Sequence, residues 1–272
     1  MSEPICPLCT SYMGSLFGNG IYYCRTCDII LNKYYKSIPY EDTYFTSDYL
    51  AQYGKTYEMD FDNIYKASLK RISHILALCK RKNFSDMKIL DIGSALGFFL
   101  KAASDLGAES VTGVEISSFA VNYCETKLGF KTINLPFENF TTQEKYDVIT
   151  AWFFIEHCDD VFSIMKKIYS MLNDGGIFAC SLPSIYGPQF VFEKEKWISE
   201  HPVDHKIDFS PKSIHKLLKS YGYSKIKIKP SGFHPERIIK KSNWLYFPFS
   251  FLYKCFTKIT GFSDTMEVYA IK

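Results

Sequence analysis

Long apolar runs and a strong charge excess are both absent from this sequence of 272 residues. Although 47% of the residues are hydrophobic, no stretch reaches the roughly 18 apolar residues that a membrane-spanning helix needs. The start, M-S-E-P-I-C, also lacks the basic segment followed by an apolar one that marks a secretory signal. We therefore expect a soluble, cytoplasmic protein whose nine cysteines are reduced. The length allows one large domain or a domain with a small module, and we favour the second.

The net charge of +3 is too small to imply a nucleic-acid partner by itself, but it is spread unevenly. Between Lys206 and Lys258 there are eleven lysines and one arginine against only Asp208 and Glu236. This surplus would suit a phosphorylated or otherwise anionic small-molecule partner. A solvated lysine-rich surface is the more common explanation, and both stay open.

Four cysteines have the spacing of a metal site. Cys6, Cys9, Cys24 and Cys27 form C-x2-C-x14-C-x2-C, in which two knuckles each supply two thiolates to one tetrahedral Zn²⁺. Four protein ligands leave no open position, so the metal would be structural. The alternative is four unconnected reduced cysteines. Thr10 and Asp28 depart from the pattern, because glycine usually follows the second cysteine of a knuckle.

The stretch from Met87 to Leu100 predicts a strand, a loop and a helix in succession. Lys88 to Ile92 is a β-prone run with the acid Asp91 near its end. Gly93 to Gly97 is a turn of small residues, and Phe98 begins a helix. Such a loop lets backbone N–H groups approach a polar ligand at a helix N-terminus. A dinucleotide fingerprint would need a third glycine, which is missing, so a nicotinamide-dependent oxidoreductase is disfavoured.

The same stretch, read as D-x-G-x-A-x-G, resembles motif I of the class I S-adenosylmethionine-dependent methyltransferases, and further motifs follow in the family's order. Glu115 ends the next strand, where the family has an acid that binds the ribose hydroxyls. The strand K-Y-D-V-I-T-A-W then leads to the pair Glu156-His157, and N-D-G-G precedes the fifth strand. The cofactor-binding residues that this resemblance implies are Asp91, Gly93, Ser94, Ala95, Gly97, Phe98, Glu115, Ile116, Phe137, Glu138 and Trp152.

The N-terminal part resembles a particular branch of that family. Y-Y-C-R-T-C-D-I-I-L followed by E-D-T-Y-F is similar to the zinc-ribbon start of a bacterial group that includes deoxysugar C-methyltransferases and proteins of surface-glycan pathways. The resemblance implies an α/β fold with a Rossmann-like, mostly parallel sheet, an antiparallel C-terminal hairpin and a small zinc ribbon. The implied domains are a ribbon at 1–40, a helical cap at 41–84, a cofactor-binding core at 85–183, and a substrate cap with the end of the sheet at 184–272.

The resemblance also suggests a base for methyl transfer. Relatives have a histidine a few residues before F-S, where His205 stands here, and His157 is the second candidate. Asp204 could orient either ring. The expected acceptor is a small, anionic molecule such as a nucleotide-linked or phosphorylated sugar or a glycan precursor, methylated on oxygen or carbon.

Several alternatives remain at this stage. Glu138 could be a plain helix-start acid, His157 a structural residue, and Glu156 a ligand for a divalent cation. A zinc-ribbon RNA methyltransferase is the main rival function, although no N-P-P-Y tetrapeptide follows the fourth strand; a non-catalytic protein with the same fold is another.

Two further stretches are predicted in outline. The helix from Phe61 to Cys79 should direct Arg71 outward. The aromatic segment 242–261 could be a lid, a dimer surface or a membrane contact. We favour a lid or a dimer surface over a membrane contact, because Pro248 should break the helix of this segment.

Overall fold

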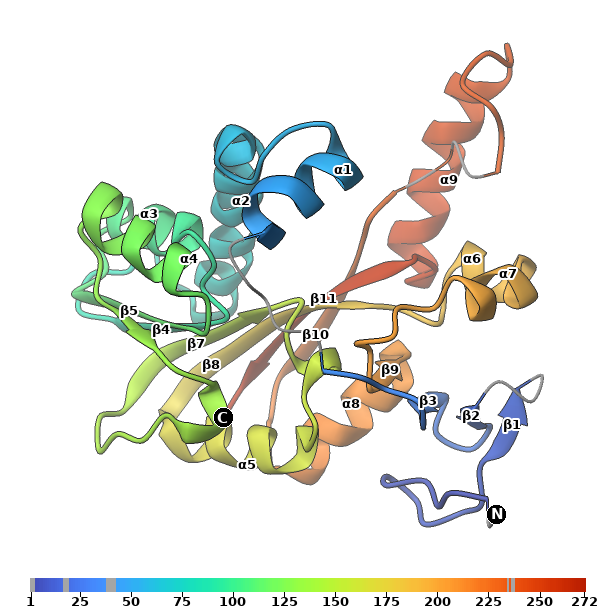
Figure 1. The fold of residues 1–272 in the computed structure, drawn as a ribbon, viewed down its shortest axis with the longest axis horizontal. Helices are drawn as coiled ribbons and strands as arrows, with labels where there is room; N and C mark the ends of the chain where they lie inside the picture. Colours follow the sequence, from blue (N-terminus) through green and yellow to red (C-terminus); the bar gives the residue numbers. More distant parts are fainter. Residues whose placement is uncertain (1–2, 17–19, 38–42, 234, 236–237) are drawn as a thin grey trace. The chain divides into compact units, whose positions relative to one another are not determined.

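The computed structural model describes residues 3–16, 20–37, 43–233, 235 and 238–272 (Figure 1). Its internal contacts divide the chain into two units. One, here called the core unit, comprises Ile38–Phe154, Phe162–Cys180 and Tyr269–Lys272. The other, called the ribbon-cap unit, comprises Met1–Ser37, Ile155–Val161 and Ser181–Val268. The predicted limit between residues 40 and 41 lies outside the described residues.

A seven-stranded sheet has the order β10-β11-β8-β7-β4-β5-β6. Strand β4 pairs in parallel with both β5 and β7, and β5 pairs in parallel with β6. This is the predicted Rossmann-like α/β sheet. The strands are β4 (Lys88–Ile92), β5 (Ser110–Glu115), β6 (Thr132–Asn134), β7 (Tyr146–Trp152), β8 (Leu172–Pro183), β10 (Ile226–Ser231) and β11 (Thr265–Ile271).

Helices of the core unit cover both faces of its strands, with α2, α3 and α4 on one side and α5 on the other in Figure 1. Apolar residues recur on one side of α2 and meet β4 and β7, so that Ile72, Ile75, Ile89 and Val148 are fully buried together. The helices are α1 (Tyr49–Tyr53), α2 (Phe61–Cys79), α3 (Phe98–Asp105), α4 (Ser118–Tyr123) and α5 (Val161–Met171).

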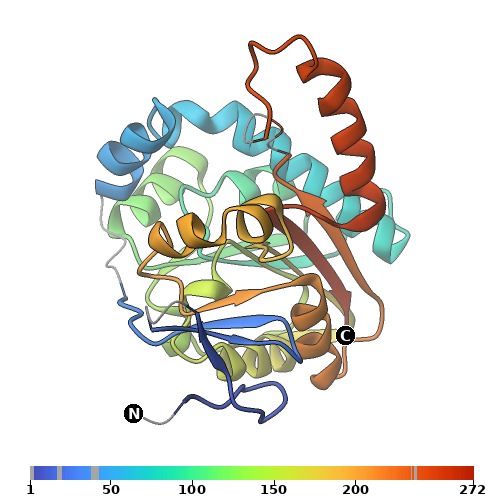
Figure 2. The ribbon, with the colours of Figure 1, turned by 90° about the vertical axis from the view of Figure 1, so that its right-hand side faces the viewer.

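The ribbon-cap unit contains a second, four-stranded sheet in the order β1-β2-β3-β9. Its strands β1 (Gly14–Leu16), β2 (Ile21–Cys24) and β3 (Ile29–Asn32) form an antiparallel meander, and β9 (Ile207–Phe209) pairs with β3 from much later in the chain (Figure 2). The ribbon therefore shares its sheet with the segment that follows His205. The helices are α6 (Pro188–Phe192), α7 (Lys194–Ser199), α8 (Pro211–Ser220) and α9 (Tyr246–Thr260).

Two predicted details are wrong. The N-D-G-G stretch, expected to precede the fifth strand, lies inside it, because β8 begins at Leu172 and includes Gly175 with a φ of +79°. Pro248 does not break the aromatic segment, because it is the third residue of α9, where a backbone N–H has no partner to lose.

Candidate functional site

The small-residue loop after β4 has a backbone that glycine makes possible. Gly93, Ala95 and Gly97 have φ angles of +67°, +48° and +83°. A Cβ added to Gly97 would collide with the Cys124 sulfur, so a side chain is excluded there by space as well as by conformation. The loop is fastened to β5, since the Gly93 N–H donates to the Val114 carbonyl at 2.8 Å.

Glu115 lies at the end of β5 and joins this loop. Its carboxylate is 7% exposed and accepts hydrogen bonds from the backbone N–H groups of Ala95, Ile116 and Ser117 at 2.8, 2.9 and 3.0 Å. Burial raises the pKa of Glu115, and these three hydrogen bonds lower it, with burial the larger effect. The acid expected to bind a ribose is thus next to the glycine loop, as the motif order predicts.

Asp91 is a second buried carboxyl group, near the end of β4. It is 1% exposed and accepts a hydrogen bond of 2.5 Å from the hydroxyl of Thr150, its partner on β7. Burial raises the pKa of Asp91 to about 8, although this hydrogen bond and the positive charge of Arg71 lower it. Arg71 does not point outward as predicted, because its guanidinium carbon lies 4.3 Å from the centroid of the Trp152 ring.

The other predicted cofactor residues are placed less uniformly. The Phe98 ring is buried against Tyr57 and Phe61, so only its backbone is available to a ligand. Phe137 is also buried, while Ile116 and Glu138 are exposed. Their roles, and that of Glu138 in reading an adenine ring, stay predictions.

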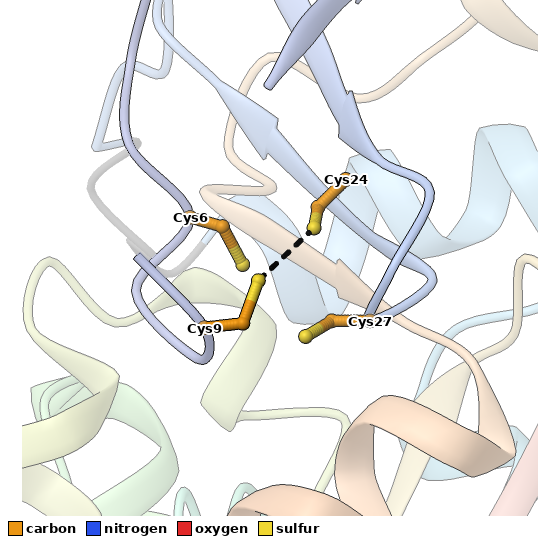
Figure 3. Close-up of side chains that lie close together, drawn as sticks. All are labelled: Cys6, Cys9, Cys24 and Cys27. Carbon is orange, nitrogen blue, oxygen red and sulfur yellow. Dashed lines mark hydrogen bonds between the residues drawn. The ribbon is translucent and has the colours of Figure 1, made fainter. Parts of the chain in front are cut away.

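The four cysteines of the ribbon lie together with their sulfur atoms pointing to one centre (Figure 3). All four sulfurs are within 4.8 Å of one another, and those of Cys9 and Cys24 are 3.5 Å apart. Zn–S bonds of about 2.3 Å in a tetrahedron bring sulfurs to roughly this spacing, so the residues fit a Zn²⁺ ion. The ammonium of Lys216 donates to the Cys27 sulfur at 3.2 Å and would offset part of the charge of four thiolates.

The two knuckles adopt the same backbone despite their unusual residues. Thr10 and Asp28 have φ angles of +60° and +56°, which is the left-handed conformation that glycine normally supplies there. Each donates its N–H to the first cysteine of its own knuckle, at 2.8 Å to the Cys6 and Cys24 carbonyls. The strain of a β-branched Thr10 is the cost of keeping this turn.

Three histidines gather elsewhere in the ribbon-cap unit, two of them around one aspartate. The buried carboxylate of Asp208 lies 2.7 Å from His201 Nε2 and 3.2 Å from His205 Nδ1. Burial raises the pKa of Asp208, but the two histidines more than reverse this and lower it to about 2. Burial lowers the pKa of His205, but Asp208 outweighs it, so this pKa is raised. The pair therefore favours an ionised Asp208 beside His205.

His157 and Glu156 form the rest of this cluster. His157 Nδ1 lies 2.9 Å from the Asp204 carbonyl and 3.2 Å from its carboxylate, and its ring is 4.9 Å from that of His205. Glu156 is 1% exposed, and neither of its carboxylate oxygens has a hydrogen-bond partner among the described residues. Donor atoms of Glu156, His157 and His205 lie within 4.8 Å of one another, so a divalent cation or an acceptor hydroxyl could bind there.

A pocket of about 270 Å³ opens beside these histidines within the ribbon-cap unit. Among its described lining residues are one large aromatic ring and several acids, and none is lysine or arginine. His205 lines the pocket and His157 does not. The polar and aromatic lining includes Trp197, Glu200, His201, His205, Asp208 and Asp264.

The ribbon holds the backbone of this cluster directly. The Asn32 side chain donates to the His205 carbonyl at 3.1 Å, and the Asn32 N–H donates to the Lys206 carbonyl at 3.0 Å. The Tyr35 hydroxyl donates to the His157 carbonyl at 2.7 Å. Both candidate bases are therefore hydrogen-bonded to residues that follow the cysteine knuckles.

Residues 64–228 match the profile of a family described as a methyltransferase domain, which is more than half of the chain. The chain belongs to the class I S-adenosylmethionine-dependent methyltransferases. A SAM-dependent methyltransferase from Archaeoglobus fulgidus has the same fold, with a TM-score of 0.59 and 18% identity over 85% of this chain and 100% of that one.

Curated relatives of this methyltransferase match over shorter stretches. The ubiquinone biosynthesis O-methyltransferase of Colwellia psychrerythraea is 25% identical over 104 residues, 36% of this chain and 42% of that protein. Its counterpart in Cereibacter sphaeroides is 22% identical over 167 residues, 56% of this chain and 66% of that protein. The chain thus spans less than two thirds of either relative.

The edge of the core unit fits the cofactor that this family uses. The Ser94 hydroxyl and the Trp152 indole nitrogen are buried without a hydrogen-bond partner among the described residues, whereas the buried carboxyl groups of Asp91 and Glu115 have partners. A buried polar group without a partner costs free energy that a polar ligand can recover. Bare polar groups beside a glycine loop are what a methyltransferase needs to bind a nucleoside.

Sequence reasoning missed several residues of the candidate site. Thr150 and Asn32 act across strand pairs, and no local pattern reveals them. His201 and Asp208 could have been found, since they lie four residues before and three after His205 in one polar run.

Proposed function

We propose that the protein transfers a methyl group from S-adenosylmethionine to a small acceptor bound in the pocket of the ribbon-cap unit, with His205 as the general base. The observation that carries this proposal is the Asp208–His205 pair on the pocket lining. His157, which follows Glu156, is the alternative base.

The cofactor would be held by the core unit. The Glu115 carboxylate would accept the ribose hydroxyls, the loop from Gly93 to Gly97 would admit the cofactor close to the backbone, and Asp91 would offer a carboxylate to its cationic part. When bound, S-adenosylmethionine supplies an electrophilic methyl group, so the protein mainly has to orient the acceptor, which can contribute roughly 7–11 kcal/mol.

His205 is suited to removing a proton from the acceptor. With Nδ1 directed at Asp208, the favoured tautomer has its proton on Nδ1 and a lone pair on Nε2. Nε2 can then take the proton of a hydroxyl or an acidic carbon, and ionised Asp208 stabilises the imidazolium that forms.

The acceptor we propose is a nucleotide-linked or phosphorylated sugar or glycan precursor, methylated on oxygen or carbon. Trp197 and the acids of the pocket suit a hydroxylated ring, because a sugar presents both an apolar face and donors for carboxylates. The acidic lining does not suit a phosphate, which would have to bind outside the pocket, against lysines of the basic stretch that begins at Lys206. The O-methyltransferase names of the curated relatives support oxygen as the target.

The ribbon would hold one structural Zn²⁺ at Cys6, Cys9, Cys24 and Cys27, as in the zinc-ribbon branch. Four thiolates complete the coordination, so the ion itself would not contact the acceptor.

The test is methyl transfer from labelled S-adenosylmethionine to a panel of nucleotide-sugars, phosphorylated sugars and RNA. His205→Ala should lower turnover by about 10²–10⁴-fold and leave cofactor affinity unchanged, because a base acts on the acceptor alone. His157→Ala is the matched control and should cost less. Labelling of RNA alone would favour the rival function, and a greater loss in His157→Ala would reverse the two roles.

A further inference from the structure

The outer face of α9 is apolar, which is the reverse of an ordinary surface helix. Tyr253 and Thr257 are buried on its inner face. The opposite side, with the residue pair that precedes the helix, exposes large side chains by 41 to 85%. This apolar face comprises Trp244, Leu245, Phe247, Phe251, Leu252, Phe256 and Ile259.

Positive charge borders this face, and negative charge is absent from the segment. Lys254 and Lys258 are exposed and lie one turn apart along the helix, next to Phe247 and Phe251 on a helical projection. Residues 238–263 contain two further lysines and no aspartate or glutamate. A partner for this surface should therefore be apolar and anionic.

A second copy of the chain fits these properties poorly. In a two-fold dimer the same patch faces itself, so the lysines of one α9 would approach those of the other with no acid in the segment to pair with them. A bilayer with anionic headgroups supplies apolar depth and negative charge together, and tryptophan and phenylalanine are favoured at its interface.

From this face we infer that α9 lies flat on an anionic membrane surface, with its apolar side in the boundary between headgroups and acyl chains. It does not cross the bilayer, because none of the helices in the described part of the chain is long and apolar enough to do so. The aromatic rings bury in the interface, and Lys254 and Lys258 contact the headgroups.

The experiment is flotation of the full-length protein with vesicles of phosphatidylcholine alone or of equal parts phosphatidylcholine and phosphatidylglycerol. The protein should float with the anionic vesicles and much less with the neutral ones. Phe247→Ser/Phe251→Ser should weaken binding by about 100-fold, since each ring contributes roughly tenfold. Lys254→Gln/Lys258→Gln should weaken it by about 30-fold, since each lysine contributes about 1 kcal/mol.

Met59→Ser is the matched control, because Met59 is 72% exposed and lies in the core unit. It should bind vesicles like the wild type, and all variants should keep the wild-type circular dichroism spectrum. Equal flotation of wild type and Phe247→Ser/Phe251→Ser would overturn the inference. So would a wild-type dimer in light scattering that this double variant converts to monomer, because α9 would then be a contact between copies.

Discussion

Two buried aspartates, one in each unit, have opposite surroundings. Asp91 in the core unit accepts a hydrogen bond from one hydroxyl, and its pKa is raised to about 8. Asp208 in the ribbon-cap unit lies against two histidines, and its pKa is lowered to about 2. Burial acts in the same direction on both, so the neighbours decide which carboxyl group is ionised.

The surroundings of the two carboxyl groups suit them to different roles. The positive charge of Arg71 acts on Asp91 but does not outweigh burial, so the cationic part of a ligand would further favour the ionised carboxylate. Asp208 already has two imidazole partners within hydrogen-bonding distance and is suited to orienting them. In the proposed reaction, Asp91 would contact the cationic part of the cofactor, and Asp208 raises the pKa of His205, the proposed base.

We expect the largest effect from loss of a zinc ligand in the ribbon, and this loss should disrupt the ribbon-cap unit alone. Structural zinc contributes about 10–16 kcal/mol in small zinc domains, so Cys24→Ser should release the metal and unfold β1 to β3. The cysteine spacing alone predicts that only the N-terminal fold depends on zinc. Because β3 pairs with β9 and Asn32 is hydrogen-bonded to the His205 carbonyl, we expect Cys24→Ser to lose turnover as well. Metal analysis of the wild type should give one zinc per chain.

Calorimetry supplies the control for this comparison. Cofactor affinity of Cys24→Ser should stay near that of the wild type, because the glycine loop and Glu115 belong to the core unit. Cys180→Ser, at a buried cysteine outside the ribbon, should keep its zinc. Less than about half an equivalent of zinc in fresh wild-type protein would contradict a four-thiolate site.

The next largest effect is expected from removing the charge of Asp208. Asp208→Asn removes the charge that raises the pKa of His205, so turnover should fall by about 10–100-fold, less than for loss of the base itself. The base must be neutral to act, so the wild-type rate should rise with pH through a pKa above 6.5, and the Asp208→Asn variant should rise at lower pH. An unchanged acidic limb would mean that Asp208 does not tune His205.

The same aspartate has a second signature in stability. Its folded pKa is below the ordinary value, so its contribution is present above about pH 4 and lost as the pH falls towards 2. Urea unfolding of the wild type should show this loss, and Asp208→Asn should lack it.

A smaller effect is expected at the carboxylate of β5. Glu115→Ala should weaken cofactor binding by about 1–3 kcal/mol, because the ribose hydroxyls would lose their acceptor. Isothermal calorimetry measures this directly. Glu109→Ala, at an exposed acid of the same unit, serves as the comparison. Wild-type affinity in Glu115→Ala would remove that residue from the site.

More of the core unit than of the ribbon-cap unit could be predicted from the sequence, and the reason is physical. Most of the core unit is one continuous stretch, so local periodicity and glycine positions predicted β4 and α3, and the order of the family's motifs predicted β5 and the place of Glu115. The ribbon-cap unit instead joins the N-terminal stretch to stretches that begin at residues 155 and 181. Its decisive contacts, Asn32 to His205 and Tyr35 to His157, span more than a hundred residues, and no local pattern encodes them.

The last test addresses the two aspartates themselves and disturbs neither fold. The folded pKa of Asp91 lies above its ordinary value of 3.8, so the folded state binds the extra proton and stability should fall as the pH rises from about 4 to about 8. Asp91→Asn resembles the protonated form in shape and charge, and its amide can still accept the Thr150 hydrogen bond. Its unfolding free energy should therefore match that of the wild type at low pH and fall less steeply above pH 4.

Added S-adenosylmethionine should stabilise the wild type more than Asp91→Asn near pH 8, since only a carboxylate can pair with the ligand's positive charge. Parallel urea curves for both proteins across this range, with and without the cofactor, would measure it. Identical pH dependence in the two would show that Asp91 is ionised throughout, and that the contrast with Asp208 is one of geometry alone.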